Sequence, residues 1–169
     1  MNYAVVGFGT AGYHAVKAIR TCDKEGEIDV YSNTSRAPYN PMLTTYYAFG
    51  KLEFDGLFPF GDLDQIRKEI SFHLIQEPVI RVHAKEHLVE TKQKTKQYDR
   101  ILIATGARAF APPVQGLDPE DAFLMRTVED SIRFKERLKQ KNVRHAVVIG
   151  ASIAGTQVVE VVNHVGLET

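Results

Sequence analysis

The chain has 169 residues, 44% of them hydrophobic and 25% charged, a composition that excludes a disordered chain, a collagen-like repeat and a disulfide scaffold. It has 21 basic and 21 acidic residues. Because there is no excess of positive charge to bind a phosphate backbone, we do not expect nucleic acid as a partner. The apolar runs are far shorter than the roughly 20 residues that cross a bilayer, and the N-terminus has no export signal. We therefore expect a cytoplasmic protein with no membrane partner.

The N-terminal residues predict the opening of a βαβ unit. A short apolar strand over 3–6 ends in a glycine turn, and residues 13–21 contain no helix breaker, which favours a helix. A second apolar strand over 28–31 follows at the distance that one crossover helix requires. We therefore expect two parallel, neighbouring strands with a helix between them.

A long loop comes next and leads into a capped helix. Residues 32–61 are rich in turn formers and aromatic residues, and they predict loop with one short helix. Asp62 and Gln65 have the spacing of a capping box, and apolar residues recur at helical intervals from there to about residue 72. A short amphipathic helix fits this pattern.

Strand-like patterns occupy the following part of the chain. The run 98–106 predicts a buried strand that ends in a turn of small residues, and 92–97 predicts a polar connection of hairpin type. The three strands expected before that connection lie near 72–75, 79–82 and 87–90.

The last part of the chain repeats the order of the first. A linker with two prolines and a glycine occupies residues 112–116. Thr127 and Asp130 can then cap a helix that runs to about residue 141. An apolar strand over 146–149 precedes a second glycine turn and a helix over 156–164.

Gly7, Gly9 and Gly12 have the G-x-G-x-x-G spacing of a dinucleotide-binding turn. The first glycine lets the chain turn tightly out of the strand, the second lets the backbone approach a pyrophosphate, and the third lets the helix pack closely on the strand. The helix that follows offers unpaired N–H groups and a positive dipole end to phosphates. Because the turn lies between a predicted strand and a predicted helix, we interpret it as a dinucleotide site.

The acidic residue that usually binds the adenosine ribose is missing from its expected position. It should end the second strand, about 20 residues after the last glycine, where the sequence has Ser32 and Asn33. Asp29 lies inside the strand, too early to reach the sugar. Ser32, Asn33 or neighbouring backbone would then make this contact.

The second turn has Gly150 and Gly155 at its first and third places and Ser152 at the middle one. Serine still leaves only a small side chain facing a phosphate. Two strand–turn–helix units of one kind suggest two dinucleotides, such as a flavin and a nicotinamide. A coincidental pair of glycine turns is the alternative.

Cysteine and histidine offer little further chemistry. Cys22 is the single cysteine, so the chain cannot form an internal disulfide or a paired-thiol redox centre. We expect Cys22 to be a small, partly buried apolar residue at the end of the first helix. The six histidines do not have metal-ligand spacings, and we expect no metal site.

Four motifs run along the whole chain: V-V-G-F-G-T-A-G at 5–12, A-P-Y-N-P-M-L at 37–43, Y-D-R-I-L-I-A-T-G-A-R at 98–108 and V-V-I-G-A-S-I-A-G at 147–155. In this order they resemble the FAD-dependent pyridine nucleotide-disulfide oxidoreductase superfamily, especially its branch of rubredoxin reductases, CoA-disulfide reductases, NADH oxidases and nitrite-reductase flavin modules.

The resemblance implies an α/β fold in two parts. A Rossmann-like FAD-binding domain, with a parallel sheet and an added antiparallel β segment, would occupy 1–111 and be incomplete. The linker and the truncated beginning of a second Rossmann-like, NAD(P)-binding domain would occupy 112–169. Whole members of the superfamily continue beyond this point, so we expect the chain to be an N-terminal portion.

The resemblance also implies contacts with FAD and NAD(P)H. Val79 would meet the adenine through its backbone, although it can equally be a residue of the strand core. The FAD pyrophosphate would be wrapped by Gly7, Phe8, Gly9, Thr10, Ala11 and Gly12. The flavin side would be approached by Ala104, Thr105 and Gly106. The NAD(P)H site would begin with Gly150, Ser152, Ile153, Ala154 and Gly155.

The chain departs from the superfamily in the segment 37–43. The arginine of the pattern P-Y-x-R-P-x-L is absent, so one cofactor contact is missing or replaced. In the peroxidases and CoA-disulfide reductases a redox cysteine falls close to position 42, where this chain has Met42.

The function implied is that of an NAD(P)H-dependent FAD oxidoreductase, which passes electrons from nicotinamide through FAD to an external small molecule or small redox protein. A homodimer is left open. One alternative is a cysteine-based NADH oxidase, peroxidase or CoA-disulfide reductase, against which Met42 speaks. Another is a non-catalytic, truncated nucleotide-binding fragment. No catalytic residue is identified.

Overall fold

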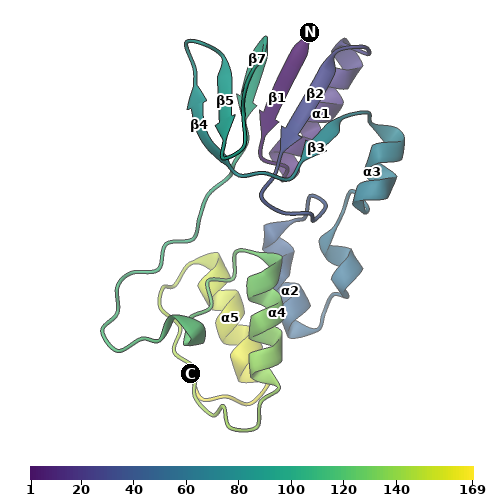
Figure 1. The fold of residues 1–169 in the computed structure, drawn as a ribbon. Helices are drawn as coiled ribbons and strands as arrows, with labels where there is room; N and C mark the ends of the chain where they lie inside the picture. Colours follow the sequence, from purple (N-terminus) through teal and green to yellow (C-terminus); the bar gives the residue numbers. More distant parts are fainter. The chain divides into compact units, whose positions relative to one another are not determined.

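The computed structural model describes residues 1–169, of residue 119 the backbone only, and the chain divides into two compact units (Figure 1). Unit 1 consists of Met1–Tyr39 and Phe58–Ala107, and unit 2 of Asn40–Leu57 and Arg108–Thr169. Residues 40–57 therefore group with the C-terminal part of the chain. A domain boundary between residues 111 and 112 stays a prediction.

Unit 1 is built on a four-stranded parallel sheet with the order β3-β2-β1-β7. Strand β1 pairs in parallel with both β2 and β7, and helix α1 (Thr10–Cys22) connects β1 to β2. The expected βαβ opening is confirmed, although the helix begins inside the glycine turn rather than after it. The strands are β1 (Asn2–Val6), β2 (Glu27–Tyr31), β3 (His73–Ile75) and β7 (Arg100–Ile103).

Helices α1 and α3 (Leu63–Glu69) cover one face of this sheet (Figure 1). Side chains alternate between the two faces of a strand, and those of Val5 and Val30 are buried on this face against Val16 of α1 and Ile66 of α3. These apolar contacts hold the glycine turn, which joins β1 to α1, on a rigid support.

A capping box begins α3, as the sequence predicts. The Asp62 side chain accepts a hydrogen bond from the Gln65 backbone at 2.8 Å, and the Gln65 side chain accepts one from the Asp62 backbone at 2.9 Å. The helix ends at Glu69, with Ile70 as its C-cap, rather than near residue 72.

A three-stranded antiparallel sheet of β4, β5 and β6 contributes to the core on the other face of the parallel sheet. Ala4, Val6 and Tyr31 are buried there with Val89 and Tyr98. The added antiparallel segment is thus confirmed, but its last strand lies in the stretch expected to be a polar connection, because this backbone pairs with β5. The strands are β4 (Val79–His83), β5 (Leu88–Thr91) and β6 (Thr95–Gln97).

Unit 2 is a small helical cluster (Figure 1). Helix α2 (Thr44–Phe49) packs on α4 (Val128–Leu138) and α5 (Ile153–His164), and together they bury Ala48 and Phe134. Thr127 and Asp130 form the expected capping box at the start of α4. Short 3-10 turns lie at Pro41–Leu43, Phe54–Leu57 and Pro119–Asp121.

The prediction of a strand over 146–149 is wrong. Only His145 forms a β-bridge, to Glu168, and the side chains of Val147 and Ile149 are 87% and 65% exposed. A strand needs neighbouring backbone to pair with, and Glu168 is the only β-bridge partner of this segment among the described residues. The segment is extended and apolar without belonging to a sheet.

Candidate functional site

The first glycine turn is fixed by main-chain hydrogen bonds at the carboxyl ends of β1 and β2. Gly7 has a φ of 104°, and its N–H donates to the carbonyl of Tyr31 at 2.8 Å. A positive φ of this size is strained for a residue with a side chain. The sharp exit from β1 therefore depends on glycine at position 7.

The three glycines of this turn have different surroundings. A Cβ atom on Gly7 would collide with the backbone oxygen of Ala104, and one on Gly12 would collide with the oxygen of Gly7. A Cβ atom on Gly9 would meet nothing within 4 Å. The protein's own packing thus requires the first and third glycines, whereas the second borders open space of the kind that a ligand's pyrophosphate needs.

The start of α1 offers unoccupied hydrogen-bond donors beside that space. Gly9 is the N-cap and provides no side-chain cap, and no acidic residue lies in the first turn. The N–H groups of a helix's first turn lack acceptors within the helix, so those of Thr10 and Ala11, both exposed, remain available for an anion. The Phe8 side chain is buried, with its ring centroid 5.1 Å from that of Phe72. Only the backbone of Phe8 is therefore left for a ligand.

The segment after β7 lies directly against this turn. The N–H of Ala104 donates to the carbonyl oxygen of Val6 at 2.7 Å. A Cβ atom on Gly7 would collide with the backbone of Ala104 and Thr105. Gly106 follows with a φ of 69°. The structure therefore brings together two sets of candidate cofactor residues that lie about a hundred positions apart in sequence.

The candidate ribose and adenine residues differ in accessibility. Ser32 is buried, and its hydroxyl donates to the Thr34 carbonyl at 2.9 Å while accepting from the Thr34 N–H at 3.2 Å. Asn33 is exposed beyond the end of β2. Val79 begins β4 and packs against the core formed with Val89. Asn33 is thus the better placed of the two polar side chains for a sugar hydroxyl.

The carboxylate of Asp29 is buried among other side chains and is not open to a ribose. Asp29 is only 3% exposed, and its carboxylate accepts hydrogen bonds from Lys96 at 2.8 Å, Tyr98 at 2.7 Å and His73 at 3.3 Å. The Tyr31 and Tyr98 hydroxyls lie 2.6 Å apart. Because the Tyr98 proton goes to Asp29, Tyr31 is the donor in that pair. We call these five residues the Asp29 network.

The Asp29 network keeps its carboxylate charged. Burial alone would raise the pKa of Asp29, but hydrogen bonds from Lys96 and Tyr98 and the charge of Lys96 together hold this pKa below its ordinary value. The hydrogen bond to Asp29 raises the pKa of Lys96, and burial raises that of Tyr98. A neutral tyrosine and a charged lysine thus satisfy the buried anion.

The second glycine turn, in unit 2, repeats the geometry of the first. Gly150 has a φ of 105°, and a Cβ on Gly155 would collide with the oxygen of Gly150. The middle residue, Ser152, is the N-cap of α5, and its hydroxyl accepts a hydrogen bond from the Gly155 N–H at 3.3 Å. Ile153 is 71% exposed and Ala154 is also exposed, so this turn too is open to a ligand.

The family model described as pyridine nucleotide-disulphide oxidoreductase matches residues 1–169. The chain belongs to this family. Its members are oxidoreductase enzymes that use FAD and NAD(P)H, so the expected recognition, fold class and cofactors are confirmed at the level of the family. The roles of individual residues stay predictions.

Relatives of the chain have different names. It is 28% identical to the epsilon subunit of NADH-dependent phenylglyoxylate dehydrogenase from Aromatoleum evansii, over 94% of this chain and 37% of that one. It is also 28% identical to an NADH oxidase from Methanocaldococcus jannaschii, over 93% and 36% of the two chains. The structure of an NAD-dependent persulfide reductase from A. fulgidus matches with a TM-score of 0.89 and 25% identity, over 99% and 33%. The chain thus spans about a third of the length of these relatives.

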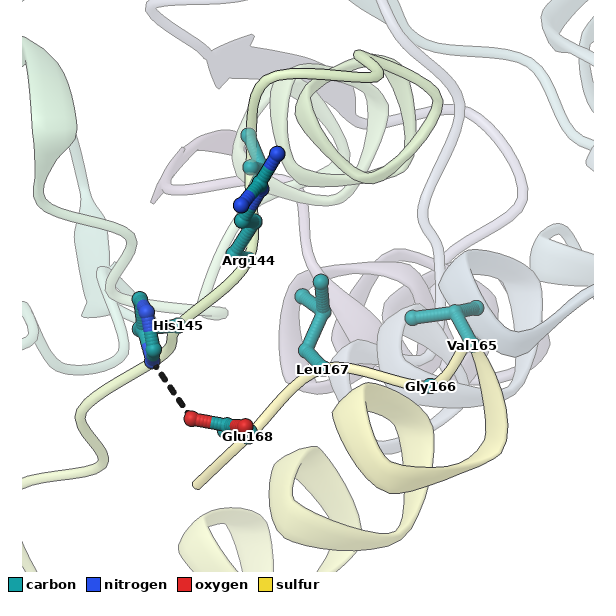
Figure 2. A pocket seen from close by; sticks show the side chains of 7 residues that line it. Arg144, His145, Val165, Gly166, Leu167 and Glu168 are labelled. Atoms are coloured by element: carbon teal, nitrogen blue, oxygen red, sulfur yellow. Dashed lines mark ion pairs between the residues drawn. The ribbon is translucent and has the colours of Figure 1, made fainter.

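A hollow in unit 2 is lined by residues on either side of the second glycine turn and α5, and by none of the turn itself (Figure 2). Figure 2 shows the side chains of His145 and Glu168 pointing toward one another, and they form an ion pair at 3.0 Å. His145 begins the extended segment whose other end leads into the second turn. Because nucleotides bind at the carboxyl ends of strands in such folds, we do not assign this hollow to a cofactor. Its lining residues are Val143, Arg144, His145, Val165, Gly166, Leu167 and Glu168.

Thiol and metal chemistry have little support in the described part of the chain. The expected partial burial of Cys22 is wrong, because it is exposed at the last residue of α1. It lies twelve residues, or roughly 18 Å, along the helix from Thr10. Met42 is 55% exposed in the 3-10 turn that begins at Pro41. Within the described residues, no three of the His, Cys, Asp and Glu side chains gather to hold a metal, and no helix is long and apolar enough to span a bilayer.

Proposed function

We propose that this protein is an NAD(P)H-dependent FAD oxidoreductase that binds FAD at the first glycine turn and passes its electrons to an external acceptor. The observation that carries the proposal is the contrast within that turn. Gly7 and Gly12 are packed against protein backbone, but Gly9 faces open space beside uncapped helix N–H groups. Open space beside unpaired helix N–H groups is what a pyrophosphate needs.

Different residues of unit 1 would bind the different parts of FAD. The N–H groups of Thr10 and Ala11 bind the pyrophosphate, while Asn33 bonds the ribose and the Val79 backbone meets the adenine. Residues 104–106, fixed against Gly7, approach the flavin end. When bound, FAD supplies the chemistry of electron transfer, and the protein positions it and excludes competing reactions.

The second turn would bind the pyridine nucleotide in the same manner, through residues 150–155. The electron acceptor is left unspecified, because the relatives are named for phenylglyoxylate, for NADH oxidation and for persulfide. A cytoplasmic location and a homodimer remain predictions. The distance of Cys22 from the first turn, and methionine at position 42, favour electron transfer without a thiol relay.

Replacing Gly9 by valine should lower FAD affinity at least tenfold, while the unfolding free energy falls by only about 1 kcal/mol, because valine is a poorer helix N-cap than glycine. Gly9 has a φ of −89°, which valine can adopt, and apart from its chain neighbours no protein atom lies within 4 Å of an added Cβ. The isopropyl group would fill only the space assigned to the pyrophosphate. FAD titration followed by protein fluorescence measures the affinity. Unchanged FAD binding by this variant would reject the assignment.

Replacing Cys22 by serine should leave flavin reduction by NAD(P)H, and turnover with an artificial acceptor, within about a factor of two. A thiol relay needs an accessible cysteine beside the flavin, and Cys22 lies at the far end of α1. Stopped-flow absorbance of the flavin checks the reduction step. A hundredfold loss would instead favour the cysteine-based alternative.

A further inference from the structure

We infer that Glu77 accepts a hydrogen bond from the adenosine ribose of FAD and so replaces the acidic residue that is missing after β2. This inference rests on the proposed function and adds a ligand-binding residue to unit 1. A ribose-binding carboxylate normally ends the second strand of such a fold, where this chain has Ser32 and Asn33. Glu77 offers a carboxylate from the neighbouring strand instead.

One carboxylate oxygen of Glu77 has no partner within the protein. Its Oε2 is buried without a hydrogen bond, and no other buried side-chain nitrogen or oxygen lacks one in the part of the chain that the structure describes. Such an atom costs free energy, and nearly all buried polar atoms in proteins are bonded. The buried carboxylate of Asp29 in the same unit has three donors. The exception at Glu77 is explained by a donor that comes from outside the chain.

Glu77 lies where the residues assigned to the adenosine come together. It belongs to the connection between β3 and β4, two positions before Val79. Tyr31, the last residue of β2, pairs in parallel with Ile75, the last residue of β3. Glu77 and Asn33 each follow this pair by two residues, so both leave the sheet at its carboxyl edge, on adjacent strands. Nucleotides bind at this edge in open parallel sheets.

The charge of Glu77 acts at the end of β2. Burial raises the pKa of the Tyr31 hydroxyl, and the negative charges of Asp29 and Glu77 raise it further. Both carboxylates are therefore near this strand. The oxygens of Asp29 are already occupied by the donors of its network, whereas Glu77 keeps an oxygen for a ribose hydroxyl.

The Glu77 side chain can turn toward a ligand at little cost. Its neighbours Gln76 and Pro78 are exposed and Glu77 itself is only partly buried, so this connection lies at the surface. Because Oε2 has no partner, rotation of the side chain breaks no hydrogen bond of that oxygen. A hydroxyl that donates to a charged carboxylate forms a bond roughly twice as strong as one between neutral groups.

The test compares the binding of ADP, which contains the adenosine and diphosphate of FAD, with that of 2′-deoxy-ADP and 3′-deoxy-ADP by isothermal titration calorimetry. The original protein should bind at least one deoxy analogue about tenfold more weakly than ADP, the effect of one hydrogen bond to a charged group. Glu77→Ala should bind that analogue and ADP within about a factor of two. Glu77→Gln keeps an uncharged acceptor, so its preference should fall between the two.

A second measurement separates ligand binding from a role in the fold. Because Glu77→Gln removes an unpaired buried charge, it should unfold at the same denaturant concentration as the original protein or at a higher one. A carboxylate that served the fold would lower that concentration when it is replaced. Asn33→Ala is the matched control, since it changes the adjacent strand end and should keep the preference that Glu77→Ala loses.

Three results would overturn the inference. They are equal binding of ADP and both analogues by the original protein, an undiminished preference for ADP in Glu77→Ala, and a loss of stability in Glu77→Gln. The second result is expected if only an ordered water pairs with Oε2. Gly9→Val tests the proposed function separately, because it should abolish ADP binding at the first turn. If the original protein binds no ADP, the proposed function fails together with the inference. If Gly9→Val binds ADP as tightly as the original protein does, the assignment of FAD to the first turn fails, whatever the Glu77 variants show.

Discussion

Replacing Gly12 by alanine should destabilise unit 1 by about 2 to 3 kcal/mol, the cost of overpacking a site that cannot relax. The same change in an ordinary helix stabilises it by roughly 1 kcal/mol, because alanine is the better helix former. Here the sign reverses, since the new methyl group would collide with the backbone oxygen of Gly7. Gly7 cannot move away, because its N–H is bonded to Tyr31 and its Cα lies against Ala104.

Gly9→Ala is the matched control for this prediction. Both changes add one methyl group to the same turn, but the methyl at position 9 meets no protein atom. Chemical denaturation followed by circular dichroism should therefore show a loss of no more than about 1 kcal/mol for Gly9→Ala, which comes from alanine being a poorer helix N-cap than glycine. If Gly12→Ala proves as stable as Gly9→Ala, the close approach of α1 to the turn does not exist as described.

Replacing Lys96 by methionine should lower the free energy of unfolding at pH 7 by about 2 to 3 kcal/mol. The ammonium group donates to the buried carboxylate of Asp29 at 2.8 Å, and its loss leaves a buried charge with fewer partners. Lys94→Met is the control, because the Lys94 side chain is exposed on the turn between β5 and β6. Equal stabilities for the two variants would contradict the prediction.

The Asp29 network also contributes to the pH dependence of stability. The pKa of Asp29 is lower in the folded protein than in the unfolded chain, where an aspartate titrates near 3.9, so the unfolded state binds more protons in this range. Its contribution to stability is therefore complete above about pH 4 and is lost as the pH falls through the folded value. In Lys96→Met this pKa rises, so the loss should begin at a higher pH. Acid titrations of both proteins measure the shift.

Local features of the fold could be predicted from the sequence. The first glycine turn, the capping box at Asp62 and the capping box at Thr127 depend on residues within a few positions of one another, and spacing alone identifies them. A strand depends on its neighbour. The apolar run 146–149 satisfies every local rule for a strand, yet it has almost no partner to pair with, whereas the polar run 95–97 forms one because β5 lies beside it.

In the candidate site, too, the local features could be predicted from the sequence, and the contacts between distant residues could not. The spacing of Gly7, Gly9 and Gly12 indicates what each glycine does, and the structure assigns open space to the middle one. The Asp29 network was not predicted, since Lys96 and Tyr98 lie 67 and 69 positions from Asp29. The available signal was a carboxylate between Ile28 and Val30 in an apolar strand, which indicates a buried charge and so a partner of opposite charge.

The main-chain hydrogen bonds at the first turn determine how this part of the chain fluctuates. Gly7 and Ala104 donate to Tyr31 and Val6, so their amides are bonded to the strands β1 and β2 themselves. Such amides exchange with deuterium only when the sheet opens as a whole. The space around Gly150 is open, and local opening suffices there. We therefore expect the amides of the first turn to exchange among the slowest of unit 1, and those of the second turn to exchange faster.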